Sequence, residues 1–434
     1  MEILTLLIFC VFLIVCILFD FSILYALVTG FFLFCGYGLI KGYSLKSLLL
    51  MGFSGIKTVK NILIIFMLIG VLTALWRAAG TLPFIISWSV SLVNPSVFLF
   101  TVFLLNCLIS VLTGTAFGTA ATMGVITMTI SNSIGMNPVF TGGAVMSGIF
   151  FGDRCSPVST SALLTAELTK TDIFENIKRM IKTAVVPFGL TCIIYLIMGY
   201  SAEISAVDVD IKSIFEKSFG LHWITVLPAV VIFGLSVCRV KVRTAMSASI
   251  LTAFLTAVFY QKTEFGELFQ IIVKGYYSDD VITGKMLNGG GIMSMFKVAV
   301  IVCISSSYGG IFEGVNLLLP LKNIIAKLSR KITPFGSILV SSVGAGMIAC
   351  NQTLAIILVN QLCRDMEEDN QIFAIDLENS AVVIAPLIPW SIAGAVPLAS
   401  VGAPTSALWA ACFLYILPLY TFIVKIFSSH KLKK

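Results

Sequence analysis

The chain has 434 residues, of which 58% are hydrophobic and 11% charged, and its mean hydropathy is +1.03. This composition excludes a water-soluble protein, because so few polar side chains cannot cover its surface. Its formal charge of +7 does not indicate nucleic-acid binding, since the cations lie in short connections between apolar runs, where they set orientation in a membrane. We therefore expect an all-α polytopic membrane protein that is embedded in the lipid bilayer.

The first two apolar runs, residues 3–19 and 21–40, predict a helical hairpin. No basic residue precedes the first run and no small-residue cleavage site follows it, so we interpret it as a retained helix rather than a signal peptide. Runs of roughly 20 apolar residues, the length that crosses about 30 Å of hydrocarbon, recur to the C-terminus. Each half is expected to contain two spans, a loop rich in Gly and Lys, a third and a fourth span, a broken or re-entrant region and a closing span.

Two pairs of polar segments interrupt the apolar runs at a constant spacing. The separation along the chain from Gly114 to Gly346 equals the separation from Pro157 to Pro389. A third pair of landmarks, TALWRAAG and SSYGGIFEG, ends at positions 80 and 314, and its separation differs from that of the other pairs by only two positions. Matched interruptions at nearly one offset are typical of a duplicated transporter whose substrate site is formed by both halves.

The charged connections predict how the chain is oriented. Connections rich in Lys and Arg are expected to face the cytoplasm, and they contain Lys41, Lys46, Lys57, Lys60, Lys170, Lys178, Arg179, Lys182, Arg239, Lys241, Arg243, Lys322, Lys327, Arg330, Lys331, Lys431, Lys433 and Lys434. Acidic or cation-poor connections are expected to face outward, and they contain Asp20, Glu203, Asp208, Asp210, Glu216 and the run 364–369. The first half then runs from inside to outside and the second from outside to inside.

The predicted organisation is therefore two repeats of inverted topology, each with about five spans and with broken or re-entrant helices. The first repeat covers residues 1–204, an extracytoplasmic linker covers 205–219, and the second repeat covers 220–434. Both termini are expected in the cytoplasm.

The first pair of interruptions brings hydroxyl, amide and backbone groups to the predicted membrane midplane. Irregular backbone is tolerated at that depth only where it is buried in protein or lines a wet cavity, and its carbonyls and helix N-termini can bind a cation or an anion. The alternative is close helix packing through small residues. The candidate substrate or ion ligands in this pair are Thr113, Gly114, Thr115, Gly118, Thr119, Asn351, Gln352 and Thr353.

The second pair of interruptions, residues 152–161 and 386–394, places proline and hydroxyl groups where a helix would otherwise continue. Proline cannot donate a backbone hydrogen bond, so carbonyl oxygens become available to a ligand. The candidate ligands in this pair are Ser156, Pro157, Ser159, Thr160, Ser161, Trp390 and Ser391.

Three carboxylates are candidates for proton coupling. Asp153 is the first, because a charge at the centre of a membrane costs about 2.5–3.5 kcal/mol on insertion scales and is rarely retained without a function. Its alternatives are an internal ion pair with Arg154 or an interfacial position. Glu313 and Glu378 also lie at the ends of apolar runs, where either side chain could carry a proton. Glu378 could equally cap a helix at the outer surface.

The cysteines and histidines do not indicate a metal site. The eleven cysteines occur singly, and His222 and His430 lie at a span end and in the tail. Neither zinc-ligand spacing nor a disulfide framework is present. We expect no cofactor, no metal other than a transported Na⁺, and no enzymatic activity.

Four stretches of the sequence resemble the NhaC-type sodium/proton antiporter family, within the wider ion transporter superfamily. They are GTAFGTAATMGV at 114–125, SGIFFGDRCSPVSTSALLTA at 147–166, CNQTLAIIL at 350–358 and LENSAVVIAPLIPWSIAGA at 377–395, and the resemblance extends over nearly the whole chain. It implies secondary active transport in a bacterial cytoplasmic membrane, with a mobile transport part that moves against a scaffold. The implied substrates are commonly sodium and protons, and in some relatives organic acids or amino acids.

One position departs from the family motif. The motif often continues Ser-Pro-x-Ser-Asp-Thr-Thr, whereas this chain has Thr160 in place of the aspartate, so a carboxylate that could bind sodium directly is absent there. The leading prediction is a proton-coupled sodium antiporter that works by alternating access. The alternative is a cation- or proton-coupled transporter or exchanger of an amino acid or small organic acid, whose carboxylate would lie on half-helix N-termini. A passive channel is disfavoured by the inverted repeats, and a homodimer is a possible assembly.

Overall fold

The computed structural model describes residues 2–19, 21–89, 94–157, 159–201, 211–238, 240–280, 283–284, 287–315, 333–349 and 351–431, which are mainly α-helical. The helices of the first half and the linker are α1 (Glu2–Leu18), α2 (Ile23–Ile40), α3 (Leu45–Thr58), α4 (Lys60–Ala78), α5 (Thr81–Ser89), α6 (Phe98–Thr113), α7 (Ala116–Thr119), α8 (Val125–Ser133), α9 (Pro138–Cys155), α10 (Thr160–Thr169), α11 (Ile173–Tyr200) and α12 (Ile211–Ser218). The helices of the second half are α13 (Leu227–Val237), α14 (Val242–Phe259), α15 (Phe265–Lys274), α17 (Phe296–Gly314), α19 (Pro334–Ala349), α20 (Gln352–Cys363), α21 (Asn370–Glu378), α22 (Ala381–Ile384), α23 (Ile392–Val401) and α24 (Cys412–Lys431).

Shorter elements join these helices. Turns of 3₁₀ helix cover Pro95–Val97, Trp223–Val226, Ile292–Met295, Arg364–Met366, Ala385–Leu387 and Thr405–Ala410, and a π-helical turn covers Ala120–Gly124. The β-structure in the described part of the chain is one isolated antiparallel bridge, between Tyr276 and Gly289.

Several described helices are suited to a bilayer. Pro95–Thr113, Ile173–Tyr200 and Ile292–Phe312 are each long and apolar enough to cross a membrane alone. Two bent pairs raise the number of candidate spans to as many as five: Leu63–Ala78 with Thr81–Trp88, bent by 65°, and Asn370–Leu387 with Ile392–Val401, bent by 55°. The protein is an integral membrane protein, and the predicted all-α class with broken helices is confirmed. The inverted relation of residues 1–204 and 220–434 stays a prediction.

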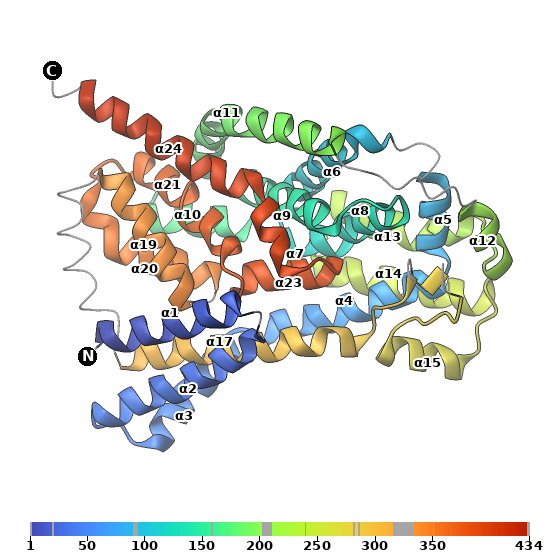
Figure 1. The fold of residues 1–434 in the computed structure, drawn as a ribbon, viewed down its shortest axis with the longest axis horizontal. Coiled ribbons are helices and arrows are strands. Elements are labelled where there is room, and N and C mark those ends of the chain that lie inside the picture. The colour runs from blue at the N-terminus through green and yellow to red at the C-terminus, as the bar shows by residue number, and fades with distance from the viewer. Residues whose placement is uncertain are drawn as a thin grey trace.

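Helices α1, α2, α3 and α17 lie together along one long side of the molecule, opposite α11 and α24 (Figure 1). We call them the α17 group, and we call α6–α11 with α19–α24 the broken-helix group. The interior of the α17 group is aromatic: the ring of Phe34 lies 5.0 Å from Phe9, 5.1 Å from Tyr308 and 4.6 Å from Phe312 between centroids. Edge-to-face contacts at such distances add stability beyond that of buried area.

Residues 45–58, which we expected to form a Gly- and Lys-rich loop, form α3. Ser44 begins this helix by accepting a hydrogen bond from the backbone N–H of Ser47 at 3.2 Å. Glycines then let α3 pack directly on α17, since a Cβ atom on Gly310 would clash with the carbonyl oxygen of Met51 and would lie 2.9 Å from the nitrogen of Gly55. The loop prediction was wrong because glycines that break a helix in water serve as a helix–helix contact in a membrane.

Gly310→Ala is expected to destabilise the protein by about 1–3 kcal/mol, the usual range for overpacking, because the added methyl group meets backbone atoms that cannot rotate away. Thermal unfolding in detergent should therefore occur at a lower temperature. Gly36→Ala in α2 is the matched control, since nothing lies within 4 Å of a Cβ atom there. Equal midpoints for the two variants would contradict the proposed contact.

The two halves of the chain interleave through buried, long-range hydrogen bonds. Trp76 of α4 donates from Nε1 to the Ser249 hydroxyl of α14 at 3.0 Å. The hydroxyl of Tyr195 in α11 donates to the carbonyl oxygen of Ala410 at 2.8 Å and pairs with the Ser147 hydroxyl of α9 at 2.7 Å. Neither half therefore has a core that is independent of the other.

Two of the predicted orientations cannot both hold. The connection 364–369, expected outside, lies beside the basic α10–α11 connection, because Arg179 donates a hydrogen bond to the side chain of Gln371 at the start of α21. Helices α19 and α20 lie side by side at that end of the molecule (Figure 1), so the chain enters and leaves from one side. This agrees with the re-entrant alternative for the interrupted region, in which two connections on either side of the region lie at the same end.

Part of the expected linker is helical, and several charged residues lie outside the part of the chain that the structure describes. Residues 211–218 of the expected linker form α12. The following charged residues used in the orientation argument lie outside the described residues: Asp20, Glu203, Asp208, Asp210, Arg239, Lys322, Lys327, Arg330, Lys331, Lys433 and Lys434.

Candidate substrate site

The polar interruptions of the sequence are helix starts in the structure. Thr115 precedes α7, Ser159 precedes α10, Asn351 precedes α20 and Ser391 precedes α23. Each of these side chains accepts a hydrogen bond from a backbone N–H of the first turn, at 2.9–3.3 Å. Such caps satisfy N–H groups that the helix itself leaves unpaired, which is why these residue types begin helices inside the protein.

The spacing of these starts differs between the two pairs. Ser159 and Ser391 keep the predicted separation, the same as that of Pro157 and Pro389, whereas Thr115 and Asn351 are four positions further apart. Helix α19 continues through Gly346, so the break comes about one turn after that landmark. The break lies within the predicted interruption, residues 344–353, but the landmark Gly346 is part of α19, where a Cβ atom would make an ordinary contact with the Ile388 side chain at 3.4 Å.

A cavity of about 370 Å³ lies where the α17 group meets the broken-helix group. Helices α3 and α17 form one wall, and α20 with the first turns of α7, α10 and α23 forms the other. The lining residues are Ser54, Gly55, Ser306, Gly309 and Gly310 on the first wall, and Phe117, Thr160, Ala349, Asn351, Gln352, Thr353, Leu354, Ile357, Ile392 and Ala393 on the second.

The described lining of this cavity is polar but uncharged. Helices α10, α20 and α23 all begin at its wall, and a helix N-terminus carries roughly half a positive charge. Ser306 is 7% exposed, and its hydroxyl has no hydrogen-bond partner among the described atoms. The cavity therefore offers hydroxyl, amide and helix-dipole groups to a polar ligand.

Asp153 lies behind the cavity wall and is 5% exposed. Its Oδ1 accepts a hydrogen bond from the Ser159 hydroxyl and its Oδ2 accepts one from the Ser161 hydroxyl, each at 3.0 Å. Thr160, between these serines, lines the cavity. The Gln352 side chain and the backbone of α7 also act on this carboxylate. Asp153, on α9, thus connects three of the helices that begin at the breaks.

Arg154 does not neutralise its neighbour Asp153, because no ion pair joins the two within the described residues. The buried guanidinium instead donates to the side-chain oxygen of Asn379, to the carbonyl oxygen of Met180 at 3.2 Å and to the hydroxyl of Thr183 at 3.0 Å. These three acceptors are neutral. The alternative in which Asp153 is retained only as the partner of Arg154 is therefore wrong.

Glu378 is the last residue of α21 and is fully buried, with no hydrogen-bond partner for either carboxylate oxygen among the described atoms. The charged groups that act on it are Arg154 and Asp153. The alternative in which Glu378 caps a helix at the outer surface is wrong, because this position is in the interior. Two residues earlier, Asp376 forms a 2.6 Å ion pair with Lys425 of α24, a contact that the sequence did not signal.

The structure places four predicted ligands on the cavity wall: Thr160, Asn351, Gln352 and Thr353. The others do not line it, and several have internal partners: the Ser156 hydroxyl donates to the Val111 carbonyl at 2.8 Å, and Trp390 Nε1 donates to the Met347 carbonyl at 2.9 Å. The predicted ligands away from the cavity lining are Thr113, Gly114, Thr115, Gly118, Thr119, Ser156, Pro157, Ser159, Ser161, Trp390 and Ser391. The side chain of Glu313, in the last turn of α17, lies outside the described residues.

The sequence analysis did not predict the cavity wall that α3 and α17 form. Its members Gly309 and Gly310 belong to the SSYGGIFEG landmark, which we used as evidence for the repeat but not for the site. A Cβ atom on Gly309 would contact Leu354 of α20 at 3.2 Å, so this glycine marks the meeting of the two groups. Paired glycines beside serines in an apolar run were the available signal.

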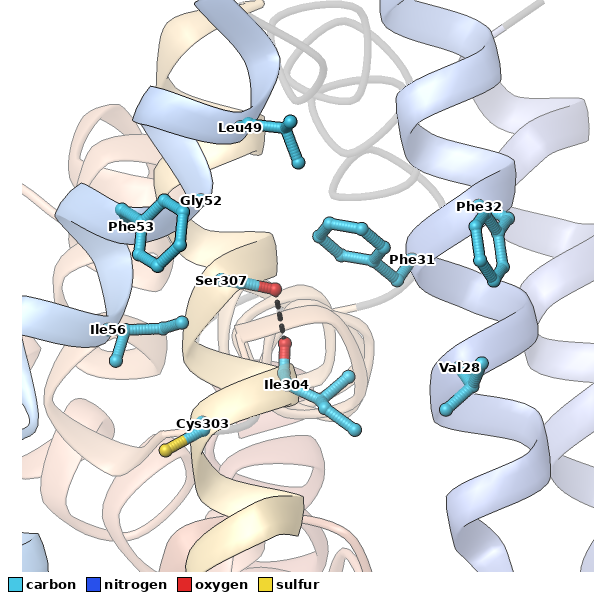
Figure 2. Close-up of a pocket in the computed structure, with 10 residues that line it drawn as sticks. All are labelled: Val28, Phe31, Phe32, Leu49, Gly52, Phe53, Ile56, Cys303, Ile304 and Ser307. Atoms are coloured by element: carbon cyan, nitrogen blue, oxygen red, sulfur yellow. Dashed lines mark hydrogen bonds between the residues drawn. The ribbon is translucent and has the colours of Figure 1, made fainter. Parts of the chain in front are cut away.

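A second cavity, of about 270 Å³, lies between α2, α3 and α17 (Figure 2). Ser307 supplies its one lining hydroxyl, which donates to the carbonyl oxygen of Ile304 at 2.6 Å. The rest of the lining is apolar except for the thiol of Cys303. Without converging polar groups, this cavity suits a hydrocarbon chain rather than an ion, and it is not a candidate for the substrate site.

Comparison with known proteins identifies the family of this chain. The model of the Na⁺/H⁺ antiporter family matches residues 1–166 and 148–428. The chain belongs to this family. The match includes both pairs of helix starts and α9 with Asp153, so the residues around the cavity lie within the part that defines the family.

Relatives in the Na⁺/H⁺ antiporter family carry different substrate names. The chain is 28% identical to the Na⁺/H⁺ antiporter NhaC of Alkalihalophilus pseudofirmus, over 85% of this chain and 82% of that protein. It is 25% identical to the malate-2H⁺/Na⁺-lactate antiporter of Bacillus subtilis, over 78% and 74%. It is 25% identical to the arginine/ornithine antiporter ArcD of Halobacterium salinarum, over 87% and 80%. The proteins similar to this chain therefore include both ion and organic-solute antiporters.

Proposed function

We propose that this protein exchanges sodium ions for protons across a bacterial cytoplasmic membrane by alternating access. The observation that supports this most is the position of Asp153, whose two oxygens are held by the hydroxyls of Ser159 and Ser161 on either side of the cavity-lining Thr160. A buried carboxylate can be neutralised by a proton or by a nearby cation. Competition between the two for one charge couples their movements.

In the proposed cycle, Na⁺ enters the cavity and is held by oxygen atoms of Thr160, Asn351 and Thr353, with Asp153 ionised behind them. The broken-helix group then moves against the α17 group and opens the cavity to the other side, where protonation of Asp153 favours release. Of the remaining predicted ligands, Thr115, Ser159 and Ser391 hold helix starts in place by capping them. A membrane potential supplies about 2.3 kcal/mol per charge per 100 mV, so exchange of more than one proton per sodium would drive sodium outward.

A second candidate function is proton- or cation-coupled exchange of a small carboxylic or amino acid. The observation that favours it is the cavity itself, which has about 370 Å³, an unpartnered Ser306 hydroxyl and no charged side chain in its described lining. Helix N-termini bind carboxylates through backbone N–H groups and the helix dipole. The names of two relatives, which include malate, lactate, arginine and ornithine, support this candidate.

One experiment separates the two candidates. Purified protein is reconstituted in liposomes that contain a pH-sensitive dye, and Na⁺, Li⁺ and K⁺ are added outside, followed by a panel of amino acids and carboxylic acids. Proton movement triggered by Na⁺ alone supports sodium–proton exchange. No response to cations together with a response to an organic solute supports the second candidate. If the dye responds to neither, uptake of labelled solutes with and without a Na⁺ gradient decides, and no uptake contradicts both candidates.

Asn351→Ala is expected to weaken apparent substrate affinity. It removes a cavity-lining amide and the cap of α20, whose oxygen accepts from the Thr353 N–H at 2.9 Å. Loss of a neutral hydrogen bond to the substrate costs about 0.5–1.5 kcal/mol, which corresponds to roughly 2- to 13-fold in the half-saturating concentration. Initial transport rates over a substrate series measure this value, and an unchanged concentration dependence would place the site elsewhere.

We also propose that both termini lie in the cytoplasm, that the protein forms a homodimer and that it catalyses no chemical reaction. The first turn of α1 and the last turns of α24 lie at the same end of the molecule (Figure 1), which supports a common side for the termini. The relatives' names, all of antiporters, support transport without enzymatic activity.

A further inference from the structure

Two buried side chains of opposite potential charge lie near each other without a bond between them. Glu378 and Arg154 are both 0% exposed. Both carboxylate oxygens of Glu378 and the Nε of Arg154 lack hydrogen-bond partners among the described atoms, although the two groups act on each other electrostatically. Leaving an ionised group unpaired in the interior costs several kcal/mol, so this arrangement needs an explanation.

The partners of Arg154 provide that explanation. Its other guanidinium nitrogens donate to Asn379, Met180 and Thr183, all neutral acceptors. A guanidinium bound in this way is not competing for a carboxylate. Glu378 lies near Arg154 and the Thr165 hydroxyl without a direct hydrogen bond to either, which is consistent with a neutral carboxyl group. If Glu378 loses its proton, the nearest gain in stability is a charge-assisted, bidentate bond to Arg154.

We propose that Glu378 binds a transported proton, in addition to Asp153, and that Arg154 becomes its counter-ion after the proton leaves. This deepens the proposed function and rests on it. When the proton leaves, Arg154 exchanges its Asn379 partner for the Glu378 carboxylate, and uptake of a proton reverses the exchange.

The positions of these residues connect the proton site to the cavity. Arg154 directly follows Asp153 on α9, and Asn379 directly follows Glu378 at the end of α21. Asn379 also donates to the Thr421 hydroxyl of α24 at 3.1 Å. A change of partner at Arg154 would therefore pull on the last turn of α9, which holds Asp153 against the helix starts around the cavity, and would replace one tie between α9 and the end of α21 by another.

Other charged groups near α21 already have partners or lie away from Glu378. On the opposite side of this helix, Asp376 pairs with Lys425 of α24. At its first turn, Arg179 of α11 contacts Gln371, and Arg364 contacts Asn370. Of the charged groups on the packed elements, Arg154 and Asp153 are those that act on Glu378, so Arg154 is the cation placed to compensate it.

The test is the number of protons moved per substrate. Wild type and Glu378→Gln are reconstituted as full chains, and the pH difference that stops net movement is measured at a fixed Na⁺ gradient and a clamped membrane potential. If the wild type transports a carboxylic acid instead of Na⁺, the measurement uses a fixed gradient of that acid in place of the Na⁺ gradient. The ratio of protons to substrate is expected to fall by one in Glu378→Gln. Glu378→Asp, which restores an ionisable group, is expected to recover the wild-type ratio.

Glu368→Gln is the matched control, because Glu368 is exposed in the connection before α21, and its ratio should equal that of the wild type. If Glu378→Gln shows no net movement, substrate–substrate counterflow decides: retained counterflow supports an obligatory proton site, and lost counterflow overturns the proposal in favour of a structural role. An unchanged ratio in Glu378→Gln also overturns it. If the wild type and Glu378→Gln move the same number of protons per substrate, only this inference is refuted. If the wild type moves no protons with its substrate, the proposed function is refuted as well.

Discussion

Asp153→Asn is expected to abolish the coupling that arises when Na⁺ and a proton compete for Asp153, while the protein remains folded. Asparagine has nearly the same shape, and its oxygen can still accept a hydrogen bond from Ser159 or Ser161, but it cannot ionise, so cation and proton have no common charge to neutralise. Loss of an interaction with a charged group costs about 1.5–3 kcal/mol, or about 10- to 150-fold in apparent cation affinity. The pH-dye assay over a series of Na⁺ concentrations measures both effects.

Asp279→Asn is the control for this experiment, because it makes the same chemical change at an exposed carboxylate in the connection between α15 and α17. Its transport should match that of the wild type. Size-exclusion profiles in detergent would establish that both variants are folded. Native rates of proton exchange in Asp153→Asn would remove the role proposed for this carboxylate.

Thr160→Asp is expected to change which substrates the cavity accepts. Thr160 is exposed on the cavity wall at the first residue of α10, where a carboxylate also interacts favourably with the helix dipole. A unit charge about 4 Å from a bound ion is worth up to about 4 kcal/mol at an effective dielectric constant of 20. We therefore expect Na⁺ to bind at least about tenfold more tightly, and any anionic solute to bind at least about tenfold more weakly.

Thr160→Asn provides the matched control, since asparagine has the shape of aspartate without its charge. Half-saturating concentrations of Na⁺ and of carboxylic acids, measured in proteoliposomes for the three proteins, test the charge effect alone. If Thr160→Asp and Thr160→Asn behave alike towards both kinds of solute, the cavity is not the place where the substrate's charge is recognised.

Most of the architecture could be predicted from composition and from the spacing of polar breaks. Ser159 and Ser391 begin helices at the predicted offset because prolines and hydroxyl groups interrupt a membrane helix for reasons that are local in sequence. The reversal of the chain at Asn351 was one of two alternatives, a broken or a re-entrant segment, that the sequence left open. A re-entrant hairpin and a straight crossing have the same hydropathy, and only packing against α10 and α21 distinguishes them.

The site was predicted in part for a similar reason. Thr160 and Asn351 stand out as polar residues within breaks, whereas Gly309 resembles any small residue used in helix packing. The bond between Arg154 and Asn379 joins positions 225 residues apart and has no local pattern. Asp153 was identified by the free-energy cost of placing a charge in the membrane. The absence of an ion pair between Asp153 and Arg154 depends on the position of α21, which the neighbouring sequence does not encode.

The contact between Arg154 and Asn379 also bears on how the protein is made. Translation proceeds at about 5–20 residues per second, so the 225 residues between them correspond to roughly 10–45 s in which α9 has been synthesised and its partner has not. A guanidinium at the centre of an inserted helix costs about 2.5–3.5 kcal/mol. Met180 and Thr183 on α11 arrive early and can hold it meanwhile, but closure of the interior around α9 must wait until α21 has left the ribosome.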